Sequence, residues 1–230
     1  DQGFVVPATL RREWDFSADG VKRSIEASLA RLGTDRIDIV YLHDPDDHEE
    51  QAVREALPAL LELREQGVVR AIGAGMNQSA MPARFIEAHD LDVVMLAGRL
   101  TLLDQTALSD LMPLASRRNV AIVAAGVYNS GLLSSARIRP DAHFDYAPAS
   151  DEVRARAERL AAVCRDHGVD LPSAAVQYPL RHPAVVSAVI GMRTAAHVDS
   201  SIERRTTPIP DELWAELDAS GLAPDLNGAA

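Results

Sequence analysis

Two short segments of the sequence carry side chains that can act on a small molecule. His43 follows an apolar run at 37–42, and an imidazole can give or take a proton near neutral pH. The segment GMRT at 191–194 follows a second apolar run and precedes an amphipathic stretch that begins near Ala195. Backbone N–H groups at a helix start, together with an arginine, can hold a pyrophosphate or an adenosine phosphate. The sequence therefore offers one candidate for proton chemistry and one for anion binding.

Each candidate also has a purely structural interpretation. His43 can cap an element or lie in the core, and Arg193 can form an ion pair with a surface carboxylate. Metal chemistry has less support, because a single cysteine, Cys164, excludes a multi-thiolate site as well as an internal disulfide. We predict no metal centre. Only one of the 23 basic residues is a lysine, Lys22, so a reaction that needs a lysine must use it.

The charge and hydropathy of the chain argue against several classes of partner. The net charge is −11, and basic residues never cluster in runs longer than two, so we expect neither nucleic acid nor an anionic membrane as a partner. No apolar run approaches the roughly 18 residues of a membrane helix, and the N-terminal segment does not resemble a signal peptide. We expect a cytoplasmic protein. Because the chain begins with Asp1, we also expect that an N-terminal portion is absent.

Five short apolar runs alternate with amphipathic segments. The runs are rich in β-branched residues and too short for helices, which is typical of strands buried on both faces. They occupy residues 37–42, 69–74, 91–96, 120–124 and 185–190. Five strand-and-helix units in series predict a parallel sheet with right-handed crossovers. The length of 230 residues fits one α/β domain that spans residues 1–230.

The segments between these runs have helix start and stop signals. Ser17 can cap a helix that ends at Gly33. The buried face of this helix is expected to consist of Val21, Ile25, Leu29 and Leu32. Further helices are expected from about 50 to 66, after Ser79, after Asp104, and from Ser150 to about 168. These helices would cover the sheet.

Two architectures fit this alternation: an open doubly wound sheet, or part of a (β/α)₈ barrel. In both, functional groups lie in the loops at the carboxyl ends of the strands, and periodicity alone does not choose between them. The longest of these loops, at about 126–150, contains the aromatic residues Tyr128, Phe144 and Tyr146. We expect it to be a functional lid, with Tyr128 either touching a substrate or packing.

Four strings occur in the order and rough spacing of the aldo-keto reductases. They are DRIDIVYLHDPD at 35–46, VRAIGAGMNQ at 69–78, AIVAAGVYNSGLL at 121–133 and HPAVVSAVIGMRTAAHVDSSIE at 182–203. The chain resembles the (β/α)₈ TIM barrel of this family from its fourth strand to its eighth. It is most similar to a bacterial branch of sugar dehydrogenases (L-fucose or D-threo-aldose 1-dehydrogenase type) and pyridoxal 4-dehydrogenases, through YLHDPDDH and AGRLTLLDQ.

The resemblance implies roles for both candidate segments. The histidine that matches His43 points into the pocket and hydrogen-bonds the reacting oxygen of the substrate. The loop that matches 191–194 binds a nicotinamide dinucleotide without a glycine-rich fingerprint. The resemblance therefore implies that Gly191, Arg193 and Thr194 bind this cofactor. His197 and Ser201 match positions beside the adenine ribose and base.

Several family positions are changed in this chain. A basic residue that some NADP-dependent members carry is Gly191 here, and an arginine that often grips the 2′-phosphate is His197, so we expect NAD or NADP with NAD favoured. A glutamine that commonly bonds the nicotinamide amide is Met95. The companion asparagine falls on Met76, so Asn77 takes that role only if the loop is shifted by one residue.

The resemblance also implies that the catalytic tyrosine, lysine and aspartate come from the first three barrel strands, upstream of this segment. Lys22 falls on a solvated helix face, and Tyr41 is expected to be a core residue without a lysine partner, so neither replaces them. We therefore expect strands 4 to 8 of the barrel in this chain, which alone would be inactive.

The leading hypothesis is an NAD(P)-dependent oxidoreductase that transfers a hydride between the cofactor and an aldose, giving a lactone, or a small aldehyde. One alternative is a non-catalytic or degenerate barrel relative; an in-frame Asp, Tyr and Lys set encoded upstream of Asp1 would argue against it. The other is an open-sheet, flavodoxin-like binding domain, which would bind phosphate after its first strand rather than its last.

Overall fold

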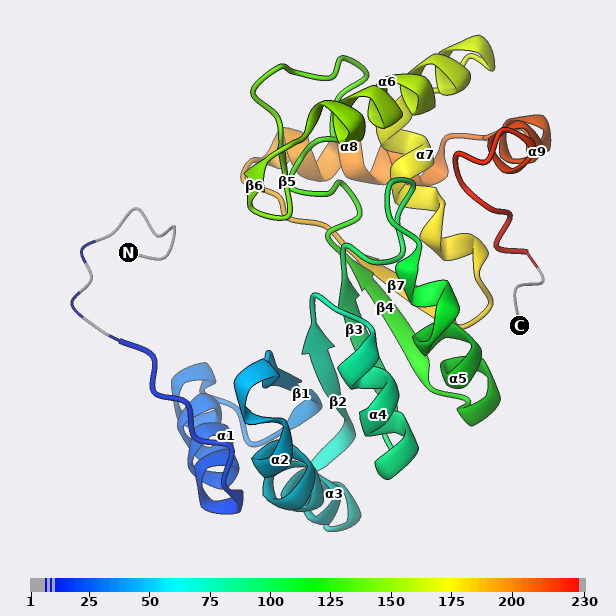
Figure 1. The fold of residues 1–230 in the computed structure, drawn as a ribbon. Coiled ribbons are helices and arrows are strands. Elements are labelled where there is room, and N and C mark those ends of the chain that lie inside the picture. The colour runs from blue at the N-terminus through cyan, green and yellow to red at the C-terminus, as the bar shows by residue number, and fades with distance from the viewer. Residues whose placement is uncertain (1–6, 8, 10, 228–230) are drawn as a thin grey trace.

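The structure is a computed structural model, and it describes residues 7, 9 and 11–227. Its centre is a five-stranded parallel sheet in the order β1-β2-β3-β4-β7, shown in Figure 1. The strands are β1 (Ile37–His43), β2 (Val69–Met76), β3 (Val93–Ala97), β4 (Ala121–Ala125) and β7 (Val185–Val189). A small antiparallel hairpin is formed by β5 (His143–Phe144) and β6 (Ala147–Pro148). All five predicted strands are present, within two residues of their expected starts and ends.

The strand order distinguishes the two architectures. A doubly wound sheet adds strands on both sides of its first strand, which then lies inside the sheet. Here β1 is an edge strand, and each strand of the sheet is hydrogen-bonded to the next one along the chain. This is the order of a (β/α)₈ barrel wall, so the prediction of barrel strands is supported and an open flavodoxin-like sheet is not.

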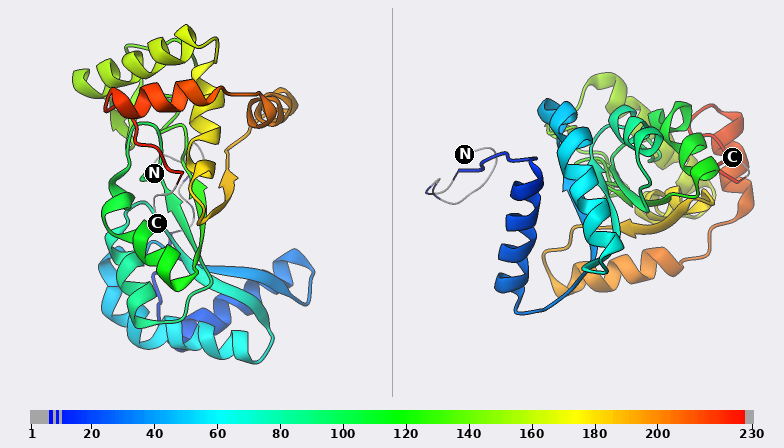
Figure 2. Two further views of the ribbon diagram at one scale, coloured as in Figure 1. Left: turned by 90° about the vertical axis from the view of Figure 1, so that its right-hand side faces the viewer. Right: turned by 90° about the horizontal axis from the view of Figure 1, so that it is seen from below.

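Helices alternate with the strands, and several of them bury an apolar face. They are α1 (Ala18–Leu32), α2 (Glu49–Gln51), α3 (Leu57–Glu65), α4 (Ala80–Ala88), α5 (Leu111–Arg118), α6 (Asp151–Asp166), α7 (Leu171–Gln177), α8 (Ala195–Thr206) and α9 (Asp211–Ala219). Short 3₁₀ turns occupy Asp46–His48, Thr106–Ser109 and Pro179–Arg181. Helices α3, α4 and α5 lie along one face of the sheet (Figure 1), whereas α6, α7 and α9 pack together beyond it (Figure 2).

Two of the predicted helix boundaries are confirmed by their caps. The Ser17 hydroxyl accepts a hydrogen bond from the N–H of Gly20 at 3.0 Å, and Gly33 ends α1 with a φ of 64°. The Ser150 hydroxyl likewise accepts from the N–H of Val153 at 3.2 Å at the start of α6. Both serines satisfy N–H groups that the first helical turn leaves without a partner.

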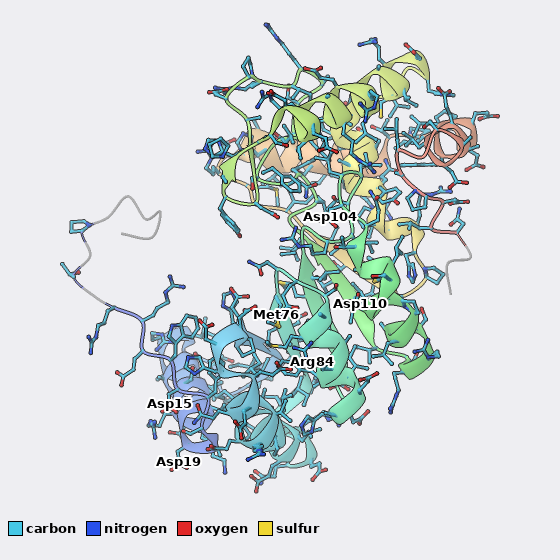
Figure 3. The ribbon with its side chains drawn as sticks, in the orientation of Figure 1. Asp15, Asp19, Met76, Arg84, Asp104 and Asp110 are labelled. Atoms are coloured by element: carbon cyan, nitrogen blue, oxygen red, sulfur yellow. The ribbon has the colours of Figure 1, made fainter. Side chains whose placement is uncertain are left out.

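Other helical predictions are corrected by the structure. Leu32 is 69% exposed, because the last turn of α1 extends past the elements on which it packs. Asp104 starts only a 3₁₀ turn, and α5 begins at Leu111 under a cap from Asp110, whose other oxygen accepts from the Ser79 hydroxyl. Asp104 and Asp110 are both labelled in Figure 3. The segment from 50 to 66 has a π-helical stretch, Ala52–Ala56, between α2 and α3.

The sheet has one covered and one largely open face. Successive side chains of a strand point to opposite faces, so Leu42, Ile72 and Leu96 share the face covered by helices, and all three are buried. The opposite, inner face would line the lumen of a barrel. At its edges Ile39 and Val189 remain 46% and 45% exposed. The inner face is therefore only partly covered within the described residues.

Tyr41 lies on this inner face, paired with Gly73 of β2. It is partly exposed and does not belong to the buried core, so the prediction of a core tyrosine is wrong. The reason is that β1 has a sheet neighbour on one side only. Partial burial nevertheless raises the pKa of its hydroxyl.

Candidate active site

One candidate site is a groove of about 510 Å³ between the loop after β4 and the loop after β7. One wall is formed by residues 126–131 and Ser134, and the other by Val189, Ile190, Gly191, Arg193 and the side of α8 that carries His197, Ser200, Ser201 and Arg204. Four predicted cofactor residues, Gly191, Arg193, His197 and Ser201, thus line one groove. The other two, Thr194 and Asn77, do not line it.

The start of α8 is fixed by its own side chains. Thr194 is the N-cap, and its hydroxyl accepts from the N–H of His197 at 3.2 Å. The His197 ring nitrogen Nδ1 in turn accepts from the backbone N–H of Arg193 at 3.3 Å, and the Ser201 hydroxyl donates to the His197 carbonyl at 2.7 Å. Thr194 therefore fixes the start of α8 rather than lining the groove.

Arg193 presents its charge to solvent at the groove. Its side chain is exposed, and no carboxylate of residues 11–227 lies within ion-pair distance of its guanidinium. The alternative interpretation, that Arg193 forms a surface ion pair, is thus not supported. An exposed guanidinium next to a capped helix start is suited to a phosphate group.

Arg204 is a groove residue that the sequence analysis did not identify. Its Nη1 donates to the Tyr128 hydroxyl at 3.3 Å, its guanidinium carbon lies 5.9 Å from the centre of that ring, and its Nε is 3.9 Å from a carboxylate oxygen of Asp170. Burial raises the pKa of Tyr128. The helical spacing of His197, Ser201 and Arg204, which places all three on one side of α8, is a signal that could have revealed it. Tyr128 packs against the hydrophobic core and also lines the groove.

The opposite wall of the groove is a tight loop. Gly126, Asn129, Ser130 and Gly131 all have positive φ values, between 45° and 89°. A side chain at Gly126 would place its Cβ 3.1 Å from the backbone nitrogen of Gly98, so this position is crowded as well as left-handed. Asn129 is 3% exposed and donates to the Gly98 carbonyl at 3.3 Å. The sequence analysis did not identify Asn129, although an asparagine beside Ser-Gly is typical of such turns.

His43 ends β1 on the inner face, as the family resemblance implies, but outside the groove. Its register partner is Gly75, and the same row continues through Met95, Val123 and Ser187. The imidazole is 72% exposed, and its Nδ1 lies 3.6 Å from a carboxylate oxygen of Asp44. A core histidine is thereby excluded, and the exposed side chain lies at the inner face of the sheet.

The structure also separates Asn77 from Met76. Met76 is buried at 2% exposure and shares the helix-covered face with Leu96, its register partner, so it cannot serve the inner face. It is labelled at the carboxyl end of β2 in Figure 3. Asn77 follows it, is exposed, and offers its carbonyl to Arg99 at 2.8 Å. Met95 lies on the inner face. Of Met76 and Asn77, only Asn77 is exposed.

Neither a metal cluster nor a membrane segment is found in the part of the chain that the structure describes. No group of three or more His, Cys, Asp or Glu side chains is arranged to hold a metal ion among these residues. None of their helices combines the length and the apolar character that crossing a bilayer requires.

Comparison with known proteins identifies the family. The model of the "Aldo/keto reductase family" matches residues 10–221. D-threo-aldose 1-dehydrogenase of Pseudomonas sp. is 44% identical over 225 residues, which cover 97% of this chain and 68% of that protein. Pyridoxal 4-dehydrogenase of Microbacterium luteolum is 40% identical over 232 residues, again covering 68% of its length. The chain belongs to the aldo/keto reductase family.

Solved structures confirm the fold. A glycerol dehydrogenase of Gluconobacter oxydans superposes with a TM-score of 0.74 at 23% identity, over 95% of this chain and 69% of that one. The holo form of an aldo-keto reductase of Bacillus halodurans gives a TM-score of 0.71 at 23% identity, over 91% of this chain and 69% of that one. The five-stranded sheet is therefore a section of the family's TIM barrel, and the flavodoxin-like alternative is wrong.

Proposed function

We propose that the protein is an NAD(P)-dependent dehydrogenase that oxidises an aldose at its anomeric carbon or reduces a small aldehyde. The observation that carries this proposal is the groove at the carboxyl edge of β4 and β7, where Arg193 has no ion-pair partner among the described residues and stands beside the capped start of α8. A negatively charged ligand satisfies both features.

The groove fits the adenosine and phosphate end of a dinucleotide. Arg193 and the backbone around Gly191 would hold a phosphate, and Ser201, whose hydroxyl oxygen can still accept, would face the adenosine with His197. Because Gly191 and His197 bring no permanent positive charge, we propose NAD over NADP. Asn77, near the inner face, would contact the nicotinamide amide.

At the inner face, His43 would orient the reacting oxygen. Its exposed imidazole, at the end of β1 and on the lumen side, can donate a hydrogen bond to the anomeric hydroxyl or to an aldehyde oxygen. When bound, NAD(P) accepts the hydride from the anomeric carbon, leaving a lactone, or returns it to an aldehyde carbon in its reduced form. His43 would hold the oxygen in line while its proton leaves.

We propose that the general acid and base do not belong to the described residues. Lys22 lies on α1, where its amine is 3.3 Å from Glu62 of α3, a helix on the covered face of the sheet (Figure 1). We propose that further strands in the full-length protein supply the tyrosine, lysine and aspartate, and that they cover the open inner face.

The sugar and aldehyde substrates are proposed from the relatives' names, D-threo-aldose 1-dehydrogenase and pyridoxal 4-dehydrogenase. A second candidate is a dinucleotide-binding relative without catalysis, which is favoured by the lack of a tyrosine and lysine pair among the described residues.

The test is a steady-state assay of full-length protein with NAD or NADP against D-threo-aldoses, L-fucose and pyridoxal, with dinucleotide binding measured in parallel. Reduction of NAD with one of these substrates is expected. Binding without turnover would support the non-catalytic candidate, and absence of dinucleotide binding would refute both.

A further inference from the structure

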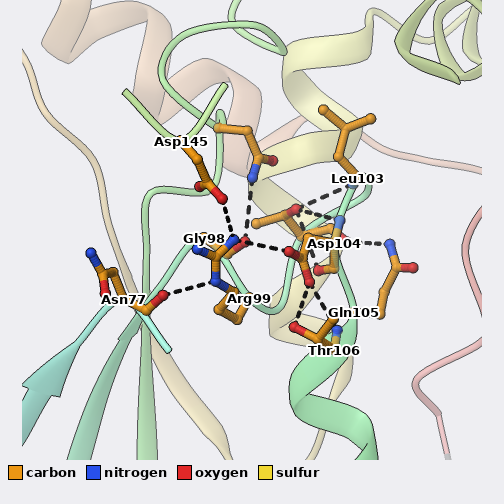
Figure 4. A network of polar contacts seen from close by, with 10 residues as sticks. Asn77, Gly98, Arg99, Leu103, Asp104, Gln105, Thr106 and Asp145 are labelled. Carbon is orange, nitrogen blue, oxygen red and sulfur yellow. Dashed lines mark hydrogen bonds and ion pairs between the residues drawn. The ribbon is translucent and has the colours of Figure 1, made fainter. Parts of the chain in front are cut away.

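Arg99 connects the loops that follow β2 and β3 at the carboxyl edge of the sheet (Figure 4). Its Nε donates to the backbone carbonyl of Asn77 at 2.8 Å. Asn77 directly follows β2, whereas Arg99 lies two residues after the end of β3. The guanidinium thus holds the backbone of the residue to which the proposed function assigns the nicotinamide amide.

Arg99 is itself fixed within the loop after β3. Its Nη1 donates to Asp104 at 3.0 Å, and its backbone carbonyl accepts from the N–H of Ala107 at 3.2 Å. Asp104 is 13% exposed, and its second oxygen accepts from the N–H and the hydroxyl of Thr106 at 2.9 and 2.7 Å. A guanidinium held in this way can fix the neighbouring loop in turn.

Asn77 differs from the next residue of its loop in what its side chain does. The amide of Gln78 is used within the protein, since it donates to Asp46 at 3.2 Å. The amide of Asn77 forms no hydrogen bond with another residue of the described chain, and it lies on the side away from Arg99 (Figure 4). The backbone of Asn77 is therefore anchored while its exposed amide is free for a ligand.

We propose that Arg99 is a positioning residue, which fixes the backbone at Asn77 so that the free amide meets the carboxamide of the nicotinamide. The inference rests on the proposed function, because that function places the nicotinamide at Asn77. An amide side chain offers a donor and an acceptor, which match the acceptor and the donor of a carboxamide. An anchored backbone lowers the entropy that is lost when these hydrogen bonds form.

The test compares the binding of NADH with that of ADP-ribose, which lacks the nicotinamide, by calorimetry on the full-length protein. In Arg99→Lys the single ammonium keeps the positive charge beside Asp104 but cannot reproduce the Nε bond to Asn77 as well. The dissociation constant of NADH should rise about fivefold, as expected for a neutral hydrogen bond that is no longer well placed. That of ADP-ribose and the melting temperature should stay unchanged.

A double-mutant cycle shows whether Arg99 acts through Asn77. Asn77→Ala removes the amide and should weaken NADH binding at least as much as Arg99→Lys does. The double variant should bind NADH like Asn77→Ala alone, because Arg99 then has no amide to position. Losses that multiply in the double variant would refute the proposal.

Asp145→Asn is the matched control. Asp145 lies in the turn between β5 and β6 and accepts from the Nη1 of Arg99 at 2.8 Å, so this variant removes a different partner of the same guanidinium. The bond from Arg99 to Asn77 remains, and NADH binding should equal that of the wild type. A loss as large as that of Arg99→Lys would assign the effect to Asp145 and refute the proposal.

Hydrogen exchange without ligand tests the anchor directly. The N–H of Met81 donates to the side chain of Gln78 at 2.9 Å, so its exchange reports on the loop after β2 and should be faster in Arg99→Lys. Unchanged exchange would refute the anchor. Equal losses of NADH and ADP-ribose affinity would show a general structural role and refute the positioning of the nicotinamide.

The wild type separates this proposal from the proposed function. If it binds ADP-ribose as tightly as NADH, the groove stands as a dinucleotide site and the role of Asn77 and Arg99 is refuted. If it binds neither ligand, the proposed function fails and the role of Arg99 toward the nicotinamide fails with it. The exchange of the Met81 N–H still decides in that case whether Arg99 holds the loop.

Discussion

The groove beside α8 and the inner face around His43 lie at the same carboxyl edge of the sheet but differ in how many elements enclose them. The groove has two walls, from the loops after β4 and β7, and its polar residues are fixed by hydrogen bonds such as that from the Ser201 hydroxyl to the His197 carbonyl. At the inner face His43 is 72% exposed, and β1 has a sheet neighbour on one side only.

Under the proposed function, this difference separates ligand binding from catalysis. The groove is assembled from elements within about 80 residues of one another, so this chain alone contains both of its walls. The inner face needs side chains from strands that would lie beyond β1 and β7 around a barrel. Binding of the adenosine end and chemistry at the nicotinamide end should therefore respond to different changes.

The largest effect is expected from expressing the 230-residue chain alone. The apolar residues Ile39 and Val186 of the two edge strands are 46% and 64% exposed, Ile202 of α8 is 60% exposed, and both edge strands have free backbone groups. We expect aggregation or a molten globule, seen as a missing cooperative transition in near-UV circular dichroism. A monodisperse monomer with a cooperative melt would contradict this expectation and show that the open face is tolerated.

The next largest effect concerns His43 at the inner face, where hydride transfer is proposed. His43→Ala in the full-length protein should reduce kcat/KM by about 10²–10³, because a positioned hydrogen bond to the reacting oxygen is lost. The dissociation constant of the dinucleotide should stay unchanged, since the groove lies on other strands. His43→Gln, which keeps an N–H donor, should recover part of the rate. Normal turnover with a lower melting temperature would instead identify His43 as a structural cap.

At the other end, Arg193→Ala should weaken binding of the dinucleotide. A charge-assisted hydrogen bond of roughly 1.5–3 kcal/mol corresponds to a loss of about 10- to 100-fold in affinity. Isothermal titration calorimetry of the full-length protein measures this loss. Arg205→Ala is the control, because Arg205 lies on the same helix outside the groove. Equal dissociation constants for Arg193→Ala and wild type would exclude this groove as the phosphate site.

The smallest of these effects concerns the choice of cofactor. His197→Arg adds a permanent positive charge at the position where the family often grips the 2′-phosphate, and should improve binding of NADP relative to NAD by about tenfold. The ratio of the two dissociation constants is the measurement, and the neutral variant His197→Gln is the control. A ratio that does not change would place the ribose away from His197.

Much of the fold follows from local signals in the sequence. The five apolar runs form strands because short, β-branched apolar segments between helices are stabilised by burial in a parallel sheet. Ser17, Gly33 and Ser150 set helix ends because they satisfy or terminate backbone hydrogen bonds locally. Helices α7 and α9 were not predicted, although Asp170 before Pro172 and the pair Asp211-Glu212 are start signals.

The site was predictable only in part. The order of motifs indicated Gly191, Arg193, His197 and Ser201, and the structure places all four on one groove. Arg204, Asn129 and Arg99 were not identified, because their partners Tyr128, Gly98 and Asp145 are 76, 31 and 46 residues away in the sequence. Contacts over such separations depend on how the strands align, which no local pattern encodes.

The sequence by itself determined the strands, most helix ends, the acidic net charge and the family resemblance, since these depend on residue types and short spacings. Only the tertiary structure decided that the sheet runs in chain order from β1 to β7, that Met76 faces the helices while His43 faces the lumen, and that Tyr41 is not a core residue. The physical reason is that burial is a property of neighbours: the same side chain is enclosed or open according to which strand lies beside it.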